Sequence, residues 1–498
     1  MNVNPITRLD YPDLDVIRVE DTYYMVSTTM HFMPGCEILQ SFDLVHWEHV
    51  TYVYETLDHT DAQQLKSGQN IYGQGMWAAS LRYHEGRFYI CFVANDTRKT
   101  YLYTSEKIDG PWKKQLIEGF YHDGSLLFDE DGRSYIVYGN DEIWITELNE
   151  DLTAPKKDGL HRLLVSDHKN PELGYEGSHI QKINGYYYIF LVHSLRDRWM
   201  RTEACFYSDS LEGEFTGGDV LCDDRGYCGQ GVAQGGIVDT PDGKWYAMLF
   251  QDSGAVGRIP ILLPVTWKDH FPFFGQNGHV PEEIEVHSTR PGYIYQPLVG
   301  SDDFCNGLLP RWQFNHDPDP RYYHLDALQG TYTITTREVC TELTQAVNTL
   351  TQRMSYPSCA AEVTVDASAL KEGDVAGLCA LQSCYAAVGI TKHHGKYEVL
   401  MLDKKEDGIL DMTEGTVVES HQMDFRLEAD FCNMKDEARC YYRVNKGDWL
   451  PIGTVHKLYF KLDHFTGCRF GLFCYAAEET GGSACFRDFK YYDVDEIS

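Results

Sequence analysis

The sequence lacks long hydrophobic runs and clusters of basic residues. No apolar stretch approaches the roughly 18 residues of a membrane-spanning helix, so a membrane partner is not expected. Lys and Arg number 43 against 75 Asp and Glu, which gives a formal net charge of −32. No Lys/Arg-rich segment offsets this field, so nucleic acids and anionic membrane surfaces are poor partner candidates. A neutral ligand meets no such repulsion.

Paired cysteines and a secretory signal are also lacking. The 15 cysteines include no CxxC pair and show no regular spacing. In a chain this large they are expected to be reduced, mostly buried structural thiols, with Cys36 and Cys228 among the buried ones. The segment Met1 to Pro5 has neither a basic nor an apolar region, so no signal peptide is expected there. Together these observations predict a cytoplasmic protein.

Helical periodicity is the third deficit. Apart from a weak 3.6-residue pattern near Thr341 to Arg353, the chain shows short alternating segments, which predict an all-β protein. The hydrophobic fraction of 43% is sufficient for ordered cores. With 498 residues the chain is expected to form two domains.

A repeated pattern fills the first three hundred residues. Each copy has a short apolar strand, a turn with acidic residues or glycine, and an aromatic-rich strand, so each predicts a β-hairpin. The copies recur at roughly 45 to 65 residues, the scale of one blade of a β-propeller, so five blades are expected. They are DLDVIRVEDTYYMVS from Asp13, WAASLRYHEGRFYICF from Trp77, DGSLLFDEDGRSYIVY from Asp123, EGSHIQKINGYYYIFL from Glu176 and QGGIVDTPDGKWYAMLF from Gln234.

Equivalent positions of these repeats should meet in space. When the copies are aligned on the aromatic strand, each begins at an equivalent residue, and three of the five are acids. The innermost strands of a propeller surround a central channel, so these side chains are expected to ring one of its mouths. The set consists of Asp13, Trp77, Asp123, Glu176 and Gln234.

The repeat stops near Asp302, after a plausible crossing segment from Pro291 to Gly300. The alternating segments beyond it predict a second antiparallel domain, a two-sheet β-sandwich. We therefore expect a propeller over residues 1–300 and a sandwich over residues 301–498. The sandwich should pack tightly on the propeller and contribute a loop to the rim of the site.

A ring of carboxyl groups suits glycosidic bond hydrolysis. Two carboxyls can divide acid and base work when their surroundings shift their pKa values apart, and a third nearby carboxylate raises the pKa of its neighbour. Trp77 offers an apolar face for a sugar ring. Singly, each acid is more often a strand cap or a cation ligand, but three at one repeat position favour catalysis.

The same residues resemble a known family. The motifs Tyr11-Pro12-Asp13-Leu14-Asp15, Trp77-Ala78, Asp123-Gly124-Ser125 and Glu176-Gly177-Ser178 are similar to those of glycoside hydrolase family 43. From Asp303-Phe304 onward the chain resembles the lectin-like, concanavalin-type sandwich of the family's β-xylosidases and α-L-arabinofuranosidases. The resemblance implies a five-bladed propeller and an inverting, exo-acting enzyme that removes terminal xylose or arabinofuranose from oligosaccharides derived from xylan or arabinoxylan.

The resemblance also implies roles for individual residues. Asp13 matches the general base, Glu176 the general acid, and Asp123 the residue that tunes the acid's pKa and orients it. Arg258 matches an arginine that contacts the sugar, a role compatible with a salt bridge to one of the carboxylates. Further substrate-binding candidates are Trp77, Gln234 and the loop residues His31 and Phe32, although a lone loop histidine is as often a packing residue.

No metal or cofactor is expected to be required for catalysis. Gln234 stands where many family members have a histidine that holds a water-linked calcium, which puts a channel metal in doubt. Asp302, Asp303 and Asp488 could form a structural calcium site in the sandwich or be ordinary surface acids.

Alternatives remain open at this stage. An endo-arabinanase-like enzyme needs an open groove, which the sandwich argues against. A non-catalytic carbohydrate-binding protein would have no reason to keep all three acids, and a structural scaffold ranks last. The expected partner is an oligosaccharide, and a homo-oligomer is allowed.

Overall fold

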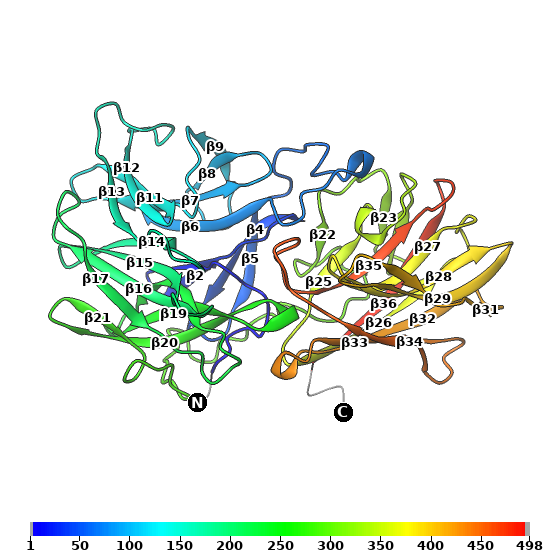
Figure 1. The fold of residues 1–498 in the computed structure, drawn as a ribbon. Helices are drawn as coiled ribbons and strands as arrows, with labels where there is room; N and C mark the ends of the chain where they lie inside the picture. The colour runs from blue at the N-terminus through cyan, green and yellow to red at the C-terminus, as the bar shows by residue number, and fades with distance from the viewer. Residues whose placement is uncertain (1–2, 494–498) are drawn as a thin grey trace.

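The computed structural model describes residues 3–493, and the predicted all-β fold is confirmed (Figure 1). The helices in this range are four short 3-10 turns, η1 (Lys66–Gly68), η2 (Gly254–Val256), η3 (Leu343–Gln345) and η4 (Cys432–Met434). No helix in this range is long and apolar enough to cross a membrane. The outer ends of the two expected domains, residues 1–2 and 494–498, lie outside the described part, and the domain limits stay predictions.

Five four-stranded antiparallel sheets form the first part of the chain. Their strands are β1 (Asp15–Val19), β2 (Thr22–Val26), β4 (Gly35–Ser41) and β5 (Glu48–Tyr54); β6 (Met76–His84), β7 (Arg87–Ala94), β8 (Lys99–Ser105) and β9 (Lys113–Ile117); β10 (Ser125–Phe128), β11 (Ser134–Asn140), β12 (Glu142–Leu148) and β13 (His161–Ser166); β14 (Glu176–Ile183), β15 (Tyr186–Ser194), β16 (Arg201–Ser208) and β17 (Thr216–Leu221); β18 (Val232–Asp239), β19 (Trp245–Asp252), β20 (Arg258–Lys268) and β21 (Phe271–Phe274).

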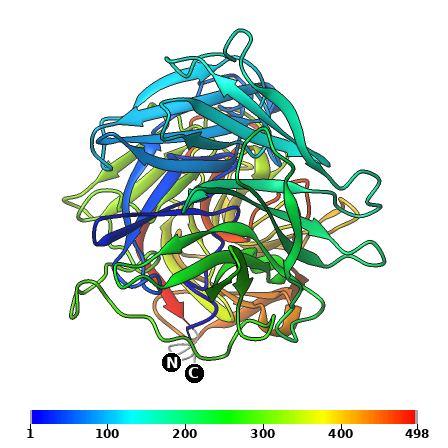
Figure 2. The same cartoon turned by 90° about the vertical axis from the view of Figure 1, so that its left-hand side faces the viewer.

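These sheets are the blades of a closed propeller. The first strands β1, β6, β10, β14 and β18 contact one another in sequence order, and β18 returns to contact β1. In Figure 2 the propeller faces the viewer and the second domain lies behind it. A hydrophobic cluster shared by the first and last blades, with Tyr11, Val16, Met248 and Leu262, seals the joint. The predicted repeat segments are the inner hairpins of the five blades.

Turn chemistry explains the inner hairpins. Asn184 and Gly185 join β14 to β15 with φ values of 51° and 84°. Two consecutive residues with positive φ match the right-handed twist of paired strands, and Asn and Gly adopt that conformation at low cost. The middle strands, such as β15, are buried along almost their whole length because each blade packs its faces on two neighbours.

The second part of the chain is a sandwich of two large sheets. The nine-stranded sheet runs in the order β3 (Phe32–Met33), β22 (Gln313–Asn315), β25 (Leu350–Arg353), β35 (Arg469–Tyr475), β27 (Val375–Leu381), β28 (Ala386–His393), β29 (Lys396–Lys404) and β30 (Leu410–Met412), with β31 (Thr416–Val418) also on β29. The seven-stranded sheet runs β23 (Tyr323–Asp326), β24 (Thr331–Thr335), β36 (Ser483–Asp493), β26 (Ser358–Asp366), β32 (Gln422–Asp430), β33 (Glu437–Arg443) and β34 (Leu450–Lys457).

Two sequence predictions were wrong. The weak helical pattern near Thr341 to Arg353 is the short η3 followed by strand β25, because Asn348, with φ 63°, breaks any helix and the strand pairs with β35. All fifteen cysteines are free thiols and Cys36 is buried, but Cys228 is exposed, since it lies in a surface loop rather than in a strand.

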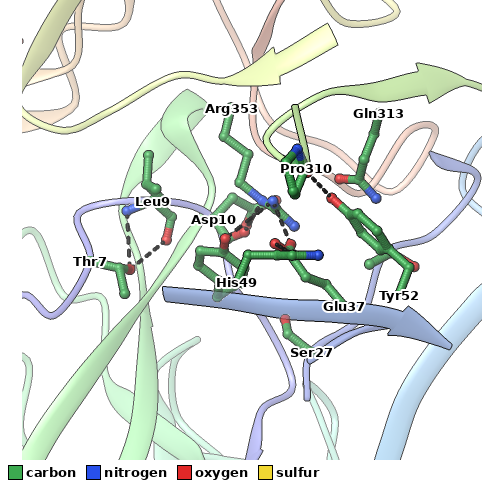
Figure 3. A network of polar contacts seen from close by, with 12 residues as sticks. Thr7, Leu9, Asp10, Ser27, Glu37, His49, Tyr52, Pro310, Gln313 and Arg353 are labelled. Atoms are coloured by element: carbon green, nitrogen blue, oxygen red, sulfur yellow. Dashed lines mark hydrogen bonds and ion pairs between the residues drawn. The ribbon is translucent and has the colours of Figure 1, made fainter. Parts of the chain in front are cut away.

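The two domains share a sheet and a buried polar network. Strand β3 leaves the first blade and pairs with β22 of the sandwich. Beside it, Arg353 donates from Nη1 to Glu37 Oε2 at 2.8 Å and from Nε to the Asp10 carbonyl at 3.0 Å (Figure 3). Burial alone would raise the pKa of Glu37, but the Arg353 charge and His49 lower it to about 2. A buried ion pair of this kind fixes the relative position of its elements because neither charge can be left unpaired.

Candidate active site

The five side chains at equivalent repeat positions, the ring residues, lie around one mouth of the propeller channel. Asp13 and Asp123 lie two residues before β1 and β10, Trp77 and Glu176 lie at the start of β6 and β14, and Gln234 lies within β18. A cavity of about 10 Å³, enough for one water, lies among these elements. Its lining includes Asp13, Asp123 and Gln234 from the ring, together with Ala78 and Gly177, the residues that follow Trp77 and Glu176.

The backbone at these positions departs from regular strand geometry in a repeated way. Asp13, Asp123 and Gln234 have φ values of 50°, 49° and 67°, a region that non-glycine residues adopt at a cost. The strand register shifts directly after Trp77 and Glu176. Bulges and left-handed residues redirect side chains and concentrate at functional sites. Here such departures occur at all five ring positions.

Asp13 is held by three donors. Its carboxylate accepts bonds from Thr28 Oγ1 at 2.8 Å, from Gln234 Nε2 at 3.0 Å, and from Arg258 Nη1 at 3.0 and 3.2 Å. Asp13 is 8% exposed and Arg258 2%. A cationic donor and two neutral donors fix the orientation of the carboxylate, as a general base requires.

Glu176 is held more loosely. Its Oε2 accepts one hydrogen bond from Asn140 Nδ2 at 2.7 Å and lies 3.6 Å from His122 Nε2. The side chain is 18% exposed, so it can meet a leaving group that arrives from solvent. Asn140 and His122 were not identified from the sequence; the position of His122 beside Asp123 was the available signal.

Asp123 is the third carboxyl group and lies near both Asp13 and Glu176. Its Oδ2 accepts the Gly177 N–H at 2.9 Å and lies 3.6 Å from His122 Nε2. Burial raises the pKa of Asp123 to about 6; the His122 charge opposes this rise, and the negative charges of Glu176 and Asp13 add to it. The Asp123 carboxylate in turn raises the pKa of His122 to about 9 against burial, with a contribution from Glu176.

The sandwich supplies one wall of the site through Phe465. Its ring lies 4.2 Å from the guanidinium of Arg258 and 5.5 Å from the ring of Trp77, and its carbonyl accepts Arg258 Nη2 at 3.3 Å. The predicted rim loop is therefore the segment between β34 and β35. No sequence pattern indicated Phe465, because its contact with Arg258 joins residues more than two hundred positions apart.

His31 and Phe32 lie in the interface between the domains. His31 is 0% exposed and packs against His316 and His464 of the sandwich, and neither of its ring nitrogens has a hydrogen-bond partner among residues 3–493. Phe32 lies in β3 and stacks under the Arg469 guanidinium at 3.4 Å. A direct contact of either residue with substrate stays a prediction.

Gln234 has a buried support that the sequence did not indicate. Its backbone N–H donates to Glu203 Oε2 at 2.7 Å. Glu203 is 0% exposed and burial raises its pKa well above the ordinary value. Gln234 thus reaches Asp13 through its side chain while Glu203 holds its strained backbone.

One set of potential metal ligands occurs among residues 3–493, and it lies in this site. Ligand atoms of His122, Asp123 and Glu176 all lie within 4.8 Å of one another. In the sandwich, Asp302 uses both carboxylate oxygens to accept the Phe304 N–H and Trp312 Nε1, at 2.8 and 2.9 Å.

A five-bladed propeller whose channel mouth carries a firmly held carboxylate, a partly exposed carboxyl and a third carboxyl of raised pKa has the groups that a glycosidase needs. The chain belongs to glycosyl hydrolases family 43: that family's model matches residues 3–272, and the model of the beta-xylosidase C-terminal concanavalin A-like domain matches residues 301–492. The family resemblance noted in the sequence is thereby confirmed. Enzymes of this family typically need no cofactor.

Individual relatives agree with this assignment. A solved structure described as a bifunctional GH43-CE protein of Bacteroides eggerthii is 42% identical over 98% of this chain, with a TM-score of 0.92. This chain spans 63% of that protein's length. A beta-xylosidase of Formosa agariphila is 26% identical, with 99% of this chain and 89% of the relative covered. A non-reducing end alpha-L-arabinofuranosidase of Bacteroides ovatus is 24% identical, with 82% and 79% covered.

Proposed function

We propose that this protein is an exo-acting, inverting glycosidase that releases terminal pentoses, β-D-xylose or α-L-arabinofuranose, from oligosaccharides derived from xylan or arabinoxylan. The observation that carries the proposal is that Asp13 and Glu176 lie around one channel mouth but differ in exposure and in hydrogen bonding. The names of the relatives, beta-xylosidase and non-reducing end alpha-L-arabinofuranosidase, support the pentose class.

The chemistry follows from the two carboxyl groups. Glu176 protonates the departing glycosidic oxygen, while Asp13 removes a proton from a water that attacks the anomeric carbon from the opposite face. The configuration inverts because the water and the leaving group lie on opposite sides of the sugar. His122 lies beside both Asp123 and Glu176, so Asp123 acts on Glu176 through the positive charge of His122.

The wall made by Phe465 supports exo action. A propeller mouth alone is a shallow bowl that would accept the middle of a polysaccharide. Phe465 contacts both Arg258 and Trp77, so the sandwich closes one side of the bowl. An endo-acting enzyme would need that side open.

Two measurements test this function. Release of nitrophenol from aryl β-D-xyloside and aryl α-L-arabinofuranoside, measured side by side, is expected with at least one of them. Time-resolved product analysis on xylo- and arabino-oligosaccharides should show single pentoses from the first turnover, with the opposite anomeric configuration by NMR. Early accumulation of longer fragments would support the endo alternative, and binding without turnover would support a carbohydrate-binding protein.

Catalysis by two carboxyls needs no Lewis acid, so any calcium held near Asp302, Asp303 and Asp488 should affect stability alone.

A cytoplasmic location is favoured by fifteen free thiols and is tested by cell fractionation. Association of copies is favoured by apolar side chains on the outer sandwich strands, Met412 at 61% and Val417 at 56% exposure, and is tested by light scattering.

A further inference from the structure

Asp10 lies three residues before Asp13 and receives a backbone N–H from each domain. Its Oδ1 accepts the N–H of Arg258, in the propeller, at 2.8 Å. Its Oδ2 accepts the N–H of Gly467, in the sandwich, at 2.8 Å. The residue is 6% exposed, so water cannot readily replace either donor. One carboxylate thus joins two segments that are separated by more than two hundred residues.

On the sandwich side, Asp10 fixes the segment that carries Phe465. The neighbouring Cys468 N–H donates to the Ala255 carbonyl at 2.8 Å, so the segment runs along the propeller residues just before Arg258. A Cβ on Gly467 would lie 2.1 Å from the Val256 carbonyl oxygen, so only glycine permits this approach. Two residues earlier, the Phe465 carbonyl and ring hold the Arg258 guanidinium.

On the propeller side, Asp10 fixes the backbone from which the Arg258 side chain extends. The Tyr11 N–H donates to the Arg258 carbonyl at 3.0 Å, which pairs the two segments. Gly257 has φ 108°, and a Cβ there would lie 2.4 Å from Asp10 Oδ1. From this anchored backbone the Arg258 side chain reaches Asp13.

We propose that Asp10 is a positioning residue of the active site, which clamps the Phe465 segment of the sandwich to the backbone of Arg258 so that the guanidinium stays on the Asp13 carboxylate. The inference rests on the proposed function, because it assigns Asp10 a part in holding the base. Asp10 itself touches neither substrate nor the reacting atoms. Its effect on turnover must therefore pass through Arg258.

The first test compares Asp10→Asn with Asp436→Asn. The asparagine keeps the shape but turns one acceptor into an N–H₂ that faces an N–H donor. Asp436 is a matched control, because it is also 6% exposed and also joins the sandwich to the propeller, by accepting the Ala255 N–H at 3.1 Å. We expect Asp10→Asn to lower kcat/KM about 10- to 100-fold while it stays folded, and Asp436→Asn to leave kcat/KM nearly unchanged.

A double-mutant cycle then separates positioning from general destabilisation. If Asp10 acts through Arg258, Asp10→Asn should cost little further activity in an Arg258→Ala background. A full additional 10- to 100-fold loss there would overturn the proposal, as would equal activity losses in Asp10→Asn and Asp436→Asn at equal Tm.

Hydrogen exchange provides a readout that does not depend on activity. In Asp10→Asn, peptides containing Arg258 and Gly467 should exchange faster than in wild type, whereas in Asp436→Asn these two should not change. Unchanged exchange in Asp10→Asn would overturn the proposal. If wild type cleaves neither aryl pentoside, the proposed function fails, and exchange alone then decides whether Asp10 clamps the two segments.

Discussion

The two sides of the channel mouth differ in how firmly they hold their carboxyl group. The Asp13 side chain is 10% exposed and receives bonds from three side chains, one of them cationic. Glu176 has an 18% exposed side chain and one hydrogen bond, from Asn140. Left-handed backbone occurs on both sides, at Asp13 and Gln234 and also at Asp123 near Glu176, so it does not distinguish them.

This difference matches the different work of a base and an acid. The base binds one water in a fixed direction, so a rigid, anionic carboxylate is advantageous. The acid must gain a proton, lose it and meet leaving groups of several shapes, so partial exposure is advantageous. The sandwich reinforces the rigid side through Phe465 and Arg258. We call the part of the mouth with Asp13 and Gln234 the tight side, and the part with Glu176, Asp123 and His122 the loose side. The two sides should respond differently to mutation.

The largest effect is expected on the tight side. Asp13→Asn removes the base, and every substrate needs that base whatever its leaving group. We expect kcat/KM to fall roughly 10³- to 10⁴-fold on both activated aryl pentosides and unactivated oligosaccharides. Steady-state kinetics on both substrates, with circular dichroism as a folding control, would measure it. A loss confined to unactivated substrates would show that Asp13 is not the base.

On the loose side, the effect should depend on the leaving group. Glu176→Gln keeps the bond with Asn140 but cannot donate a proton. Activity on oligosaccharides should fall roughly 10²- to 10³-fold, and activity on nitrophenyl glycosides less than about 10-fold, because nitrophenolate departs without protonation. A plot of log kcat against leaving-group pKa should steepen in the variant. Equal losses across the series would exclude Glu176 as the acid.

On the loose side, His122 should make the free energy of unfolding depend on pH. The Asp123 carboxylate raises the pKa of His122 from 6.5 to about 9, so this stabilisation is lost as the pH rises through about 9. It also needs an ionised Asp123, whose pKa is about 6, so it is largest near pH 7. His122→Gln should therefore lower the free energy of unfolding by about 1–3 kcal/mol at pH 7 and much less at pH 9.5. Denaturant unfolding of both proteins at the two pH values checks this. A stability difference that is constant with pH would contradict it.

The smallest effect is expected from chelators. The loose side holds the three candidate metal ligands, His122, Asp123 and Glu176. Because Glu176 must exchange a proton, we expect EDTA to leave kcat/KM on an aryl pentoside within about 2-fold of its starting value. A large loss that added calcium reverses, at constant fold, would show that a metal takes part.

The sequence by itself determined the propeller and the identity of the three acids. Turn pairs such as Asn184-Gly185 and the alternation of apolar residues are local signals, and their recurrence fixed the register that places Asp13, Asp123 and Glu176 around one channel. Spatial equivalence follows directly from repetition, since each blade is built in the same way.

Only the tertiary structure decided how those acids differ. His122, Asn140, Glu203 and Phe465 act through contacts between blades or between domains, and no local pattern records which side chains will meet there. The packing of His31 against His316 and His464 in the domain interface is a contact of this kind, and its predicted role in substrate binding stays a prediction. Charge, exposure and hydrogen bonding depend on the sum of such long-range contacts, so the sequence indicates which groups react, and packing sets how tightly each one is held.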